Sequence, residues 1–337
     1  MDPVAALRRI AYLLERDGAE TYKVRAFRSA AGAVAHVPVD RLAAMTPAQL
    51  KAIPGVGDTS ARVIREALGG GTPSYLAGIE AADTAPISAA AAALLGHLQG
   101  DCHSHSDWSD GGSPIKDMAE AARELGHRYW ALTDHSPRLT VAHGLNPERL
   151  RQQLEVVADL NTEMAPFRIL TGIEVDILED GALDQEGELL AQLDVVVASA
   201  HSKLRMEGPA MTERLVRAVE NPHTDILGHC TGRLLAGRGR PPSTFDATAV
   251  FSACADTGTA VEINSRPERL DPPEPLLSTA LSLGCVVVVD TDAHAPGQLE
   301  WQRHGCELAA DAGVSVDVVM NALPLDDFLA WTANHGA

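Results

Sequence analysis

From Leu98 onward, short apolar runs alternate with longer segments of helical spacing. Apolar runs of four to eight residues without polar alternation are typical of buried parallel strands. Candidate strands lie near residues 98–103, 129–134, 168–174, 194–200, 225–228, 259–263 and 285–290. Candidate helices lie near residues 115–126, 146–163, 211–220, 244–256, 274–283 and 300–311. This alternation predicts an α/β fold, a parallel β/α barrel with fewer strands than the usual eight.

The first seventy residues have a helical pattern instead. Amphipathic helices are predicted over residues 4–16 and 21–34, and Thr46-Pro47 is a typical start for a third, short helix. The sequence Ile53-Pro54-Gly55-Val56-Gly57 then resembles a helix-hairpin-helix motif. Pro54 ends one helix, and the two glycines permit a tight turn into the next.

Backbone amides at Gly57 to Thr59 open the second helix of this motif, and such amides suit a phosphate group. Contacts of this kind would bind the DNA backbone without reading its sequence. The alternative is that the glycines only form a turn between two helices. The residues expected to contact DNA are Gly55, Gly57, Lys23, Arg25 and Arg28.

The composition divides the chain into three parts. Residues 1–70 hold ten Lys and Arg and seven Asp and Glu, a formal charge of +3, while the remainder holds 17 and 39, a charge of −22. Residues 71–97 are rich in Gly, Pro and Ala and are predicted to be a linker with one short helix. We therefore expect a helical DNA-binding domain at 1–70, a linker at 71–97 and a barrel at 98–337.

The cysteine count and hydropathy indicate a cytoplasmic protein. Five cysteines without a Cys-x-x-Cys pair favour a reducing compartment. No apolar run reaches membrane-spanning length, and the N-terminus lacks the pattern of a signal peptide, so no membrane partner is expected. The sequence gives no indication of oligomeric state.

Residue types that bind metals follow six of the predicted strands. His103 and His105, two residues apart, can face the same side of a strand, as can Asp292 and His294. By itself, the His-x-His pair also fits two surface histidines at a strand end. Imidazole with carboxylate suits zinc, iron or manganese better than magnesium or calcium. Because active sites of β/α barrels lie at the carboxyl ends of the strands, we expect a metal site there.

The segment from His103 to Gly297 is similar to the PHP ("polymerase and histidinol phosphatase") family of metal-dependent phosphoesterases. Within that family, Gly-Arg-Leu-Leu at 232–235, Glu-Ile-Asn at 262–264 and Asp292-Ala293-His294-Ala295-Pro296-Gly297 most resemble the C-terminal domain of bacterial family X DNA polymerases. The first seventy residues resemble the N-terminal domain of the same polymerases. Residues 69–97 contain no nucleotidyltransferase motif, and Glu80 and Asp83 are their only carboxylates, so we expect no polymerase activity.

The resemblance implies a distorted (β/α)7 TIM-like barrel with two to three divalent cations (Zn, Mn or Fe) and nine ligands. One cation would take His103, His105, Glu174 and Asp292; a second would share Glu174 and add His201 and His229; a third would take Asp110, His135 and His294. Such cations make hydroxide from bound water near neutral pH, and the hydroxide attacks phosphorus. Among the ligands, Glu174, Asp292 and His135 are the residues expected to act in catalysis.

Four basic residues near the strand ends are candidates for binding substrate phosphate: Lys203, Arg233, Arg266 and Arg269. The alternative for each is a solvated charge at the rim. Arg238 and Arg240, in a Gly-rich loop, are candidates for a basic lip that holds a nucleic-acid strand.

The function that this pattern favours is hydrolysis at DNA ends, a 3′-5′ exonuclease or 3′-end processing activity in repair. A phosphatase for small phosphate esters, of the histidinol-phosphatase type, would use the same site, but it gains nothing from a helix-hairpin-helix. A DNA-end-binding protein with an inactive barrel is the third alternative, and the intact set of nine ligands argues against it.

Overall fold

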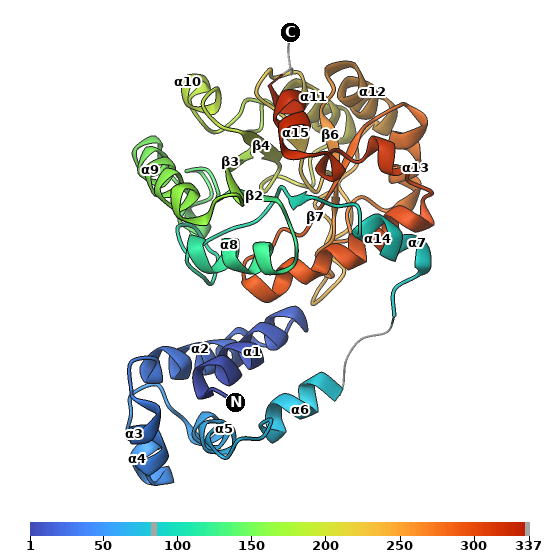
Figure 1. Cartoon of the computed structure of the whole chain (residues 1–337). Coiled ribbons are helices and arrows are strands. Elements are labelled where there is room, and N and C mark those ends of the chain that lie inside the picture. Colours follow the sequence, from blue (N-terminus) through green and yellow to red (C-terminus); the bar gives the residue numbers. More distant parts are fainter. Residues whose placement is uncertain (82–85, 334–337) are drawn as a thin grey trace. The chain divides into compact units, whose positions relative to one another are not determined.

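The computed structural model describes residues 1–81 and 86–333 (Figure 1). The chain forms two compact units, one that comprises Met1–Pro86 and Pro296–Gln298 and one that comprises Ile87–Ala295 and Leu299–Ala337. Among the described residues, no helix is both long enough and apolar enough to cross a bilayer.

The first unit consists of helices alone (Figure 1). They are α1 (Pro3–Arg16), α2 (Thr21–Val34), α3 (Val39–Ala44), α4 (Pro47–Lys51), α5 (Asp58–Leu68) and α6 (Ser74–Ala81). The apolar face of α1, with Leu7, Ile10 and Leu13, is fully buried against α2 and α5. The side chain of Thr46 caps α4 by accepting from the amide of Gln49, as its sequence predicts.

The second unit is a barrel of seven parallel strands, as predicted. The strands are β1 (Gly100–Asp101), β2 (Tyr129–Leu132), β3 (Arg168–Asp176), β4 (Val195–Ser199), β5 (Ile226–Leu227), β6 (Ala260–Asn264) and β7 (Val287–Asp290), in that spatial order. The longest strand, β3, pairs with β2 through residues 168–171 and with β4 through residues 172–176. Glu174 therefore lies inside a strand, and β3 ends two residues later at Asp176, beyond the predicted end.

Nine α-helices of the described part of this unit accompany the strands. They are α7 (Ala89–Leu95), α8 (Ile115–Glu124), α9 (Pro147–Met164), α10 (Gly187–Leu190), α11 (Gly208–Val219), α12 (Ala247–Thr257), α13 (Glu274–Ser282), α14 (Gln302–Asp311) and α15 (Leu325–Thr332). The sequence pattern had not indicated α10 or α15. Short 3₁₀ turns lie at Thr140–Ala142, Pro296–Trp301, Val316–Val318 and Met320–Ala322.

The stretch expected to be a linker contains two helices on either side of residues 82–85, which lie outside the described residues. The first, α6, packs on α1 and α5 through the buried Leu76. The second, α7, packs on α14, and Glu307 of α14 accepts from the amide and hydroxyl of Ser88. Alanine-rich sequence is a good helix former, so low complexity here does not mean an absence of structure.

The interior of the barrel is apolar at one end only. Tyr129, Val195 and Ala260 are the first residues of their strands, and they join one buried cluster that is completed by Phe328 of α15. The rings of Tyr129 and Phe328 stack with centroids 5.0 Å apart. Because α15 fills the amino end of the barrel, polar side chains of the interior gather at the carboxyl end.

Side-chain amides close the seam between the edge strands β1 and β7. The Asn321 amide nitrogen donates to Gly100 O at 3.1 Å and to Val289 O at 2.8 Å, while its oxygen accepts from Val289 N at 3.1 Å. Gln302 donates to the same two carbonyls at 3.0 and 2.9 Å. This seam brings the segments that follow β1 and β7 together at the site described below.

Asn321→Ala is expected to lower the free energy of unfolding by about 2 kcal/mol, because it leaves the buried amide of Val289 without an acceptor and removes a donor from the buried carboxylate of Asp290. Asn161 is a useful contrast, since it bridges both backbone groups of Ile169 but is only partly buried. Asn161→Ala should cost about 1 kcal/mol. Denaturant unfolding of both variants measures the difference, and equal losses would mean that the seam is not closed by Asn321.

Candidate functional site

The nine predicted ligands meet at the carboxyl end of the barrel. His103 and His105 follow β1, His135 follows β2, and His201 and His229 follow β4 and β5. Asp292 and His294 follow β7, Glu174 lies near the end of β3, and Asp110 lies in the loop after β1. All nine belong to groups whose ligand atoms lie within 4.8 Å of one another: His105, Asp110, His135 and His294; His103, Glu174 and His229; His103, His105 and Asp292; and His135, Glu174 and His201.

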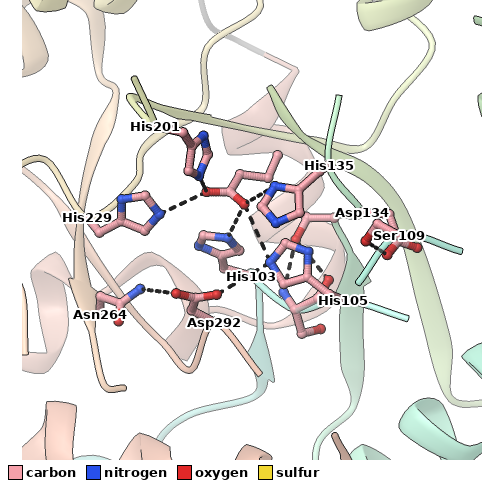
Figure 2. Close-up of polar contacts among 12 residues, drawn as sticks. His103, His105, Ser109, Asp134, His135, His201, His229, Asn264 and Asp292 are labelled. Atoms are coloured by element: carbon pink, nitrogen blue, oxygen red, sulfur yellow. Dashed lines mark hydrogen bonds and ion pairs between the residues drawn. The ribbon is translucent and has the colours of Figure 1, made fainter. Parts of the chain in front are cut away.

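Glu174 is the centre of this arrangement. One of its oxygens, Oε1, lies 2.9 Å from His229 Nε2 and 3.1 Å from His201 Nε2. The other, Oε2, lies 2.8 Å from His135 Nδ1 and 3.3 Å from His103 Nε2. Figure 2 shows these four imidazoles converging on one carboxylate from different strands. A carboxylate with ring nitrogens around both oxygens has the geometry of a bridging ligand.

Buried polar atoms test whether the site suits cations. His103 Nε2, His201 Nε2 and both ring nitrogens of His105 are buried and form no well-directed hydrogen bond among the described residues, although carboxylate oxygens lie within 3.5 Å of three of these four atoms. Burying a polar atom costs free energy unless a hydrogen bond or a cation satisfies it. Imidazole and carboxylate are preferred ligands of zinc, manganese and iron, so the chemistry of the donors and the lack of well-directed hydrogen bonds both fit divalent cations.

The protonation states of three groups also favour coordination. Burial, together with the neighbouring His294 and His135, lowers the pKa of His105 to about 3, which keeps its ring neutral. Burial opposes ionisation of Glu174, but the imidazoles of His201, His103 and His135 hold its pKa well below the usual range. For Asp292, burial is likewise outweighed, chiefly by Arg266 and His105, and the pKa is lowered. Neutral imidazole and ionised carboxylate are the forms that bind metals. Against the effect of burial, neighbouring carboxylates, Glu174 among them, raise the pKa of His103, His135 and His201, so cation binding would displace protons from these three rings.

Two further carboxylates orient the ligands, and the sequence analysis gave neither a role. Glu262 Oε1 lies 2.5 Å from His103 Nδ1, and Asp176 Oδ1 lies 3.2 Å from His201 Nδ1. In each ring this leaves Nε2 directed at Glu174, so the carboxylates fix the tautomer and the angle of the imidazole. Only Asp176 had a usable signal in the sequence, since it lies two residues beyond Glu174 on the same strand face.

The loop that carries Asp110 is held by a third buried carboxylate. Asp134 accepts from the hydroxyls of Ser106 and Ser109 and from the side-chain amide of Gln153 at 2.7 Å (Figure 2). Asp110 Oδ1 then lies 3.5 Å from His135 Nε2 and 3.3 Å from His294 Nε2. Asp134 is not one of the nine ligands, but it holds the loop from which Asp110 reaches His135 and His294.

Seven of the nine ligands, all except His103 and His105, line a cavity of about 470 Å³. Arg266 and Arg269 line it: Arg269 Nε lies 3.0 Å from Asp292 Oδ2, and an Arg266 guanidinium nitrogen lies 3.1 Å from His294 Nδ1. The described lining does not include Arg233 or Lys203. Arg233 donates instead to the carbonyls of Arg269 and Leu270, and Lys203 Nζ lies 3.7 Å from the exposed Glu179.

The helix-hairpin-helix of the first unit is formed by α4, a turn and α5. Gly55 has φ +91°, and an added Cβ would lie 2.5 Å from Ser29 Oγ, so both turn and packing require glycine. At Gly57, whose φ is −96°, a Cβ would meet nothing within 4 Å.

The amides that open α5 differ by one residue from those expected. Gly57 N donates to Ser60 Oγ at 2.9 Å, so the amides without an acceptor among the described residues are those of Asp58, Thr59 and Ser60. Lys51 Nζ lies 2.7 Å from Asp58 Oδ1 and offsets the one carboxylate at this helix start.

The three basic residues of α2 that were expected to contact DNA differ in their surroundings. Arg28 is paired with Glu15 at 2.6 Å. Lys23 and Arg25 are exposed on α2.

Ligands for divalent cations beside guanidinium groups place this barrel among the metal-dependent hydrolases of phosphate esters. The family model "Helix-hairpin-helix domain" matches residues 1–73, and the model "PHP domain" matches residues 101–266. The chain therefore carries a PHP domain, the domain of a family of metal-dependent phosphoesterases, and a helix-hairpin-helix domain.

Two relatives and one solved structure are similar to the chain. The chain is 42% identical over 237 residues to the DNA polymerase/3′-5′ exonuclease PolX of Bacillus subtilis (strain 168), covering 70% of this chain but only 41% of that protein. It is 28% identical over 236 residues to a "probable phosphatase" of Thermoanaerobacter sp. (strain X514), covering 66% and 89%. A histidinol phosphate phosphatase structure from Lactococcus lactis superposes with a TM-score of 0.48 at 18% identity, covering 65% and 95%.

Glu262→Gln is expected to weaken divalent-cation binding about 10- to 100-fold. Both oxygens of Glu262 accept, one from His103 and the other from the amides of His229 and Asn264. The NH₂ group of glutamine must therefore face a donor. Titration of metal-stripped protein with Mn²⁺ measures the affinity. Glu307→Gln, which changes a carboxylate outside the pocket, is the control, and equal affinities in the two variants would remove the role of Glu262.

Proposed function

We propose that the chain is a 3′-5′ exonuclease or 3′-end processing enzyme that acts on DNA in repair, in the cytoplasm. Nine side chains would hold two to three divalent cations, of zinc, manganese or iron. The observation that carries the proposal is the presence, in one chain, of this centre and of a helix-hairpin-helix with three unpaired amides at the start of α5. The similarity to a relative named as a DNA polymerase/3′-5′ exonuclease supports it.

The residues of the site have separable tasks in this reaction. When bound, divalent cations supply an activated water nucleophile near neutral pH and neutralise the phosphoryl oxygens. Glu174, with imidazoles around both oxygens, would hold cations together with these rings. Asp292 belongs to the ligand group with His103 and His105, and His135 belongs to the group with Glu174 and His201. Glu174, Asp292 and His135 are therefore the ligands closest to the reacting atoms in the proposal.

The guanidinium groups of Arg266 and Arg269 can donate to the phosphate of the substrate. Both lie against Asp292, which orients them toward the cavity rather than into solvent. Arg233 supports the Arg269 backbone from behind through its two carbonyl contacts. Lys203 is assigned no contact with substrate, and the absence of polymerase activity stays a prediction.

The second candidate is a phosphatase for small phosphate esters. The relative named "probable phosphatase" supports it, since the match covers 89% of that protein. The ligands and arginines would serve a monoester as well as a diester, because attack on phosphorus uses the same groups in both.

One assay separates the two candidates. The purified protein with Mn²⁺ is given a 5′-labelled single-stranded oligonucleotide and, separately, glycerol phosphate, a monoester without a ring. The exonuclease proposal predicts a ladder shortened from the 3′ end and a far higher kcat/KM for the oligonucleotide. Rapid release of phosphate from glycerol phosphate with an intact oligonucleotide would favour the phosphatase.

A further inference from the structure

A short hairpin forms part of the rim of the cavity. Leu234 N donates to Arg240 O and Arg240 N donates to Leu234 O, both at 2.9 Å, which closes an antiparallel pair around residues 235–239. Gly237 and Gly239 at its tip have φ +66°, a conformation that favours glycine. The base of the hairpin is fixed by Arg240 Nε, which donates to Gly232 O at 2.6 Å, and by Leu235 N, which donates to Glu268 O at 2.6 Å.

The hairpin presents apolar atoms to the cavity, although most of the other lining residues are charged or are histidines. Leu234, Ala236 and Gly237 line it, together with Leu139 from the loop after β2. The apolar character continues onto the surface, since Leu235 is 55% exposed and Val141 is 85% exposed on the same two loops. Apolar side chains form no hydrogen bonds or ion pairs with a phosphate group. They therefore indicate a substrate with an apolar or aromatic part next to its phosphate.

The tip of the hairpin adds a cation outside the cavity. Arg238 is exposed and has no ion pair or hydrogen bond among the described residues, whereas Arg240 is engaged with Gly232. An unpaired guanidinium beyond an apolar wall suits a second phosphate of the same substrate.

We propose that the hairpin Leu234–Arg240 is a nucleotide-binding element. Leu234, Ala236 and Leu139 would contact the sugar and base attached to the scissile phosphate, and Arg238 would bind the neighbouring phosphate of the strand. The spacing of phosphate, ring and phosphate then selects polynucleotide over small monoesters. This inference rests on the proposed exonuclease function and assigns its specificity to one loop.

The test uses the full chain with Mn²⁺ and three probes: a single-stranded oligonucleotide, the p-nitrophenyl ester of thymidine 5′-phosphate, and glycerol phosphate. Leu234→Ala should lower the kcat/KM ratio of oligonucleotide to glycerol phosphate about tenfold, the effect of about 1.4 kcal/mol of lost apolar contact. The thymidine ester should follow the oligonucleotide in this variant. Arg238→Gln should lower kcat/KM for the oligonucleotide but not for the thymidine ester or glycerol phosphate. It should also reduce the number of counterions released when the oligonucleotide binds by about one.

Ala236→Glu is a second variant that tests the apolar wall formed by Leu234, Ala236 and Leu139. Ala236 is exposed, so its substitution leaves the core unchanged. Leu125→Ala and Arg123→Gln on α8 are matched controls, because both residues are exposed and lie outside the described lining. The controls should keep the wild-type ratio, and all variants should keep the wild-type metal content and melting temperature.

The outcomes separate this inference from the function on which it rests. Wild-type hydrolysis of the oligonucleotide with unchanged ratios in Leu234→Ala, Ala236→Glu and Arg238→Gln overturns the hairpin's role and leaves the exonuclease proposal standing. An oligonucleotide that the wild type leaves intact overturns the proposed function. In that event, a thymidine ester preferred over glycerol phosphate in the wild type but not in Leu234→Ala would still support the wall and overturn only the role of Arg238.

Discussion

Glu174→Gln is expected to reduce hydrolysis by about a thousandfold or more, the largest effect of any single substitution in the chain. The carboxylate lies within 3.5 Å of five ring nitrogens, those of His103, His105, His135, His201 and His229. A loss of about 4 kcal/mol of charge stabilisation corresponds to a thousandfold in rate, and cations supply several kcal/mol in such reactions. Glutamine keeps the shape but removes the charge that neighbouring cation positions share.

The measurement pairs kcat/KM on the oligonucleotide with elemental analysis of the same preparations. Glu188→Gln is the matched control, because Glu188 is an exposed carboxylate on α10 outside the pocket. We expect Glu174→Gln to hold fewer cations than wild type, and Glu188→Gln to match wild type in both properties. A Glu174→Gln protein with full activity and a full complement of metal would contradict the central position of this residue.

Gly57→Ala is expected to weaken hydrolysis of long DNA at least about tenfold at low salt while sparing glycerol phosphate. A phosphate at the start of α5 would approach the amides of Asp58, Thr59 and Ser60, and charge-assisted bonds of this kind contribute about 1.5–3 kcal/mol each. The added Cβ meets no protein atom within 4 Å, so it occupies the space through which the phosphate approaches. Gly55→Ala would be a poor probe, because its Cβ would collide with Ser29 and disturb the turn itself.

The salt dependence distinguishes DNA contact from a general loss of stability. The ratio of wild-type to Gly57→Ala activity should fall toward one as salt rises, because counterions compete for the phosphates. Gly71→Ala is the matched control, since it also adds a Cβ in open space but lies outside the motif. If Gly57→Ala degrades DNA as fast as wild type at low salt, the helix-hairpin-helix is not a substrate anchor.

Much of the fold and of the site was predictable because buried parallel strands leave a strong pattern. Runs such as Val195–Ser199 are apolar on both faces, since one face meets the barrel interior and the other meets helices. Six of the seven runs contain or are followed by a residue of metal-binding type, and parallel strands bring their carboxyl ends to one edge. Eight of the nine predicted ligands therefore lie together, and Asp110 joins them from the loop after β1.

The parts that sequence could not predict depend on contacts between distant residues. Asn321 closes the seam from 221 residues beyond Gly100, and no local pattern marks a polar residue as a bridge. Glu262 lies in an apolar strand, but its partner His103 is 159 residues away. Arg233 and Arg269 look alike in the sequence. Only the fold shows that Arg269 lines the cavity, whereas Arg233 donates to the backbone carbonyl of Arg269.

The most direct test of the account is a metal-removal experiment on the wild-type chain, with cation content and oligonucleotide hydrolysis measured on the same samples. The account predicts two to three equivalents of divalent transition metal in the active protein. It also predicts loss of hydrolysis when a chelator removes the metal, and recovery in step with the cations that rebind when Mn²⁺ is returned. A metal-free preparation that shortens the oligonucleotide at the full rate would contradict it.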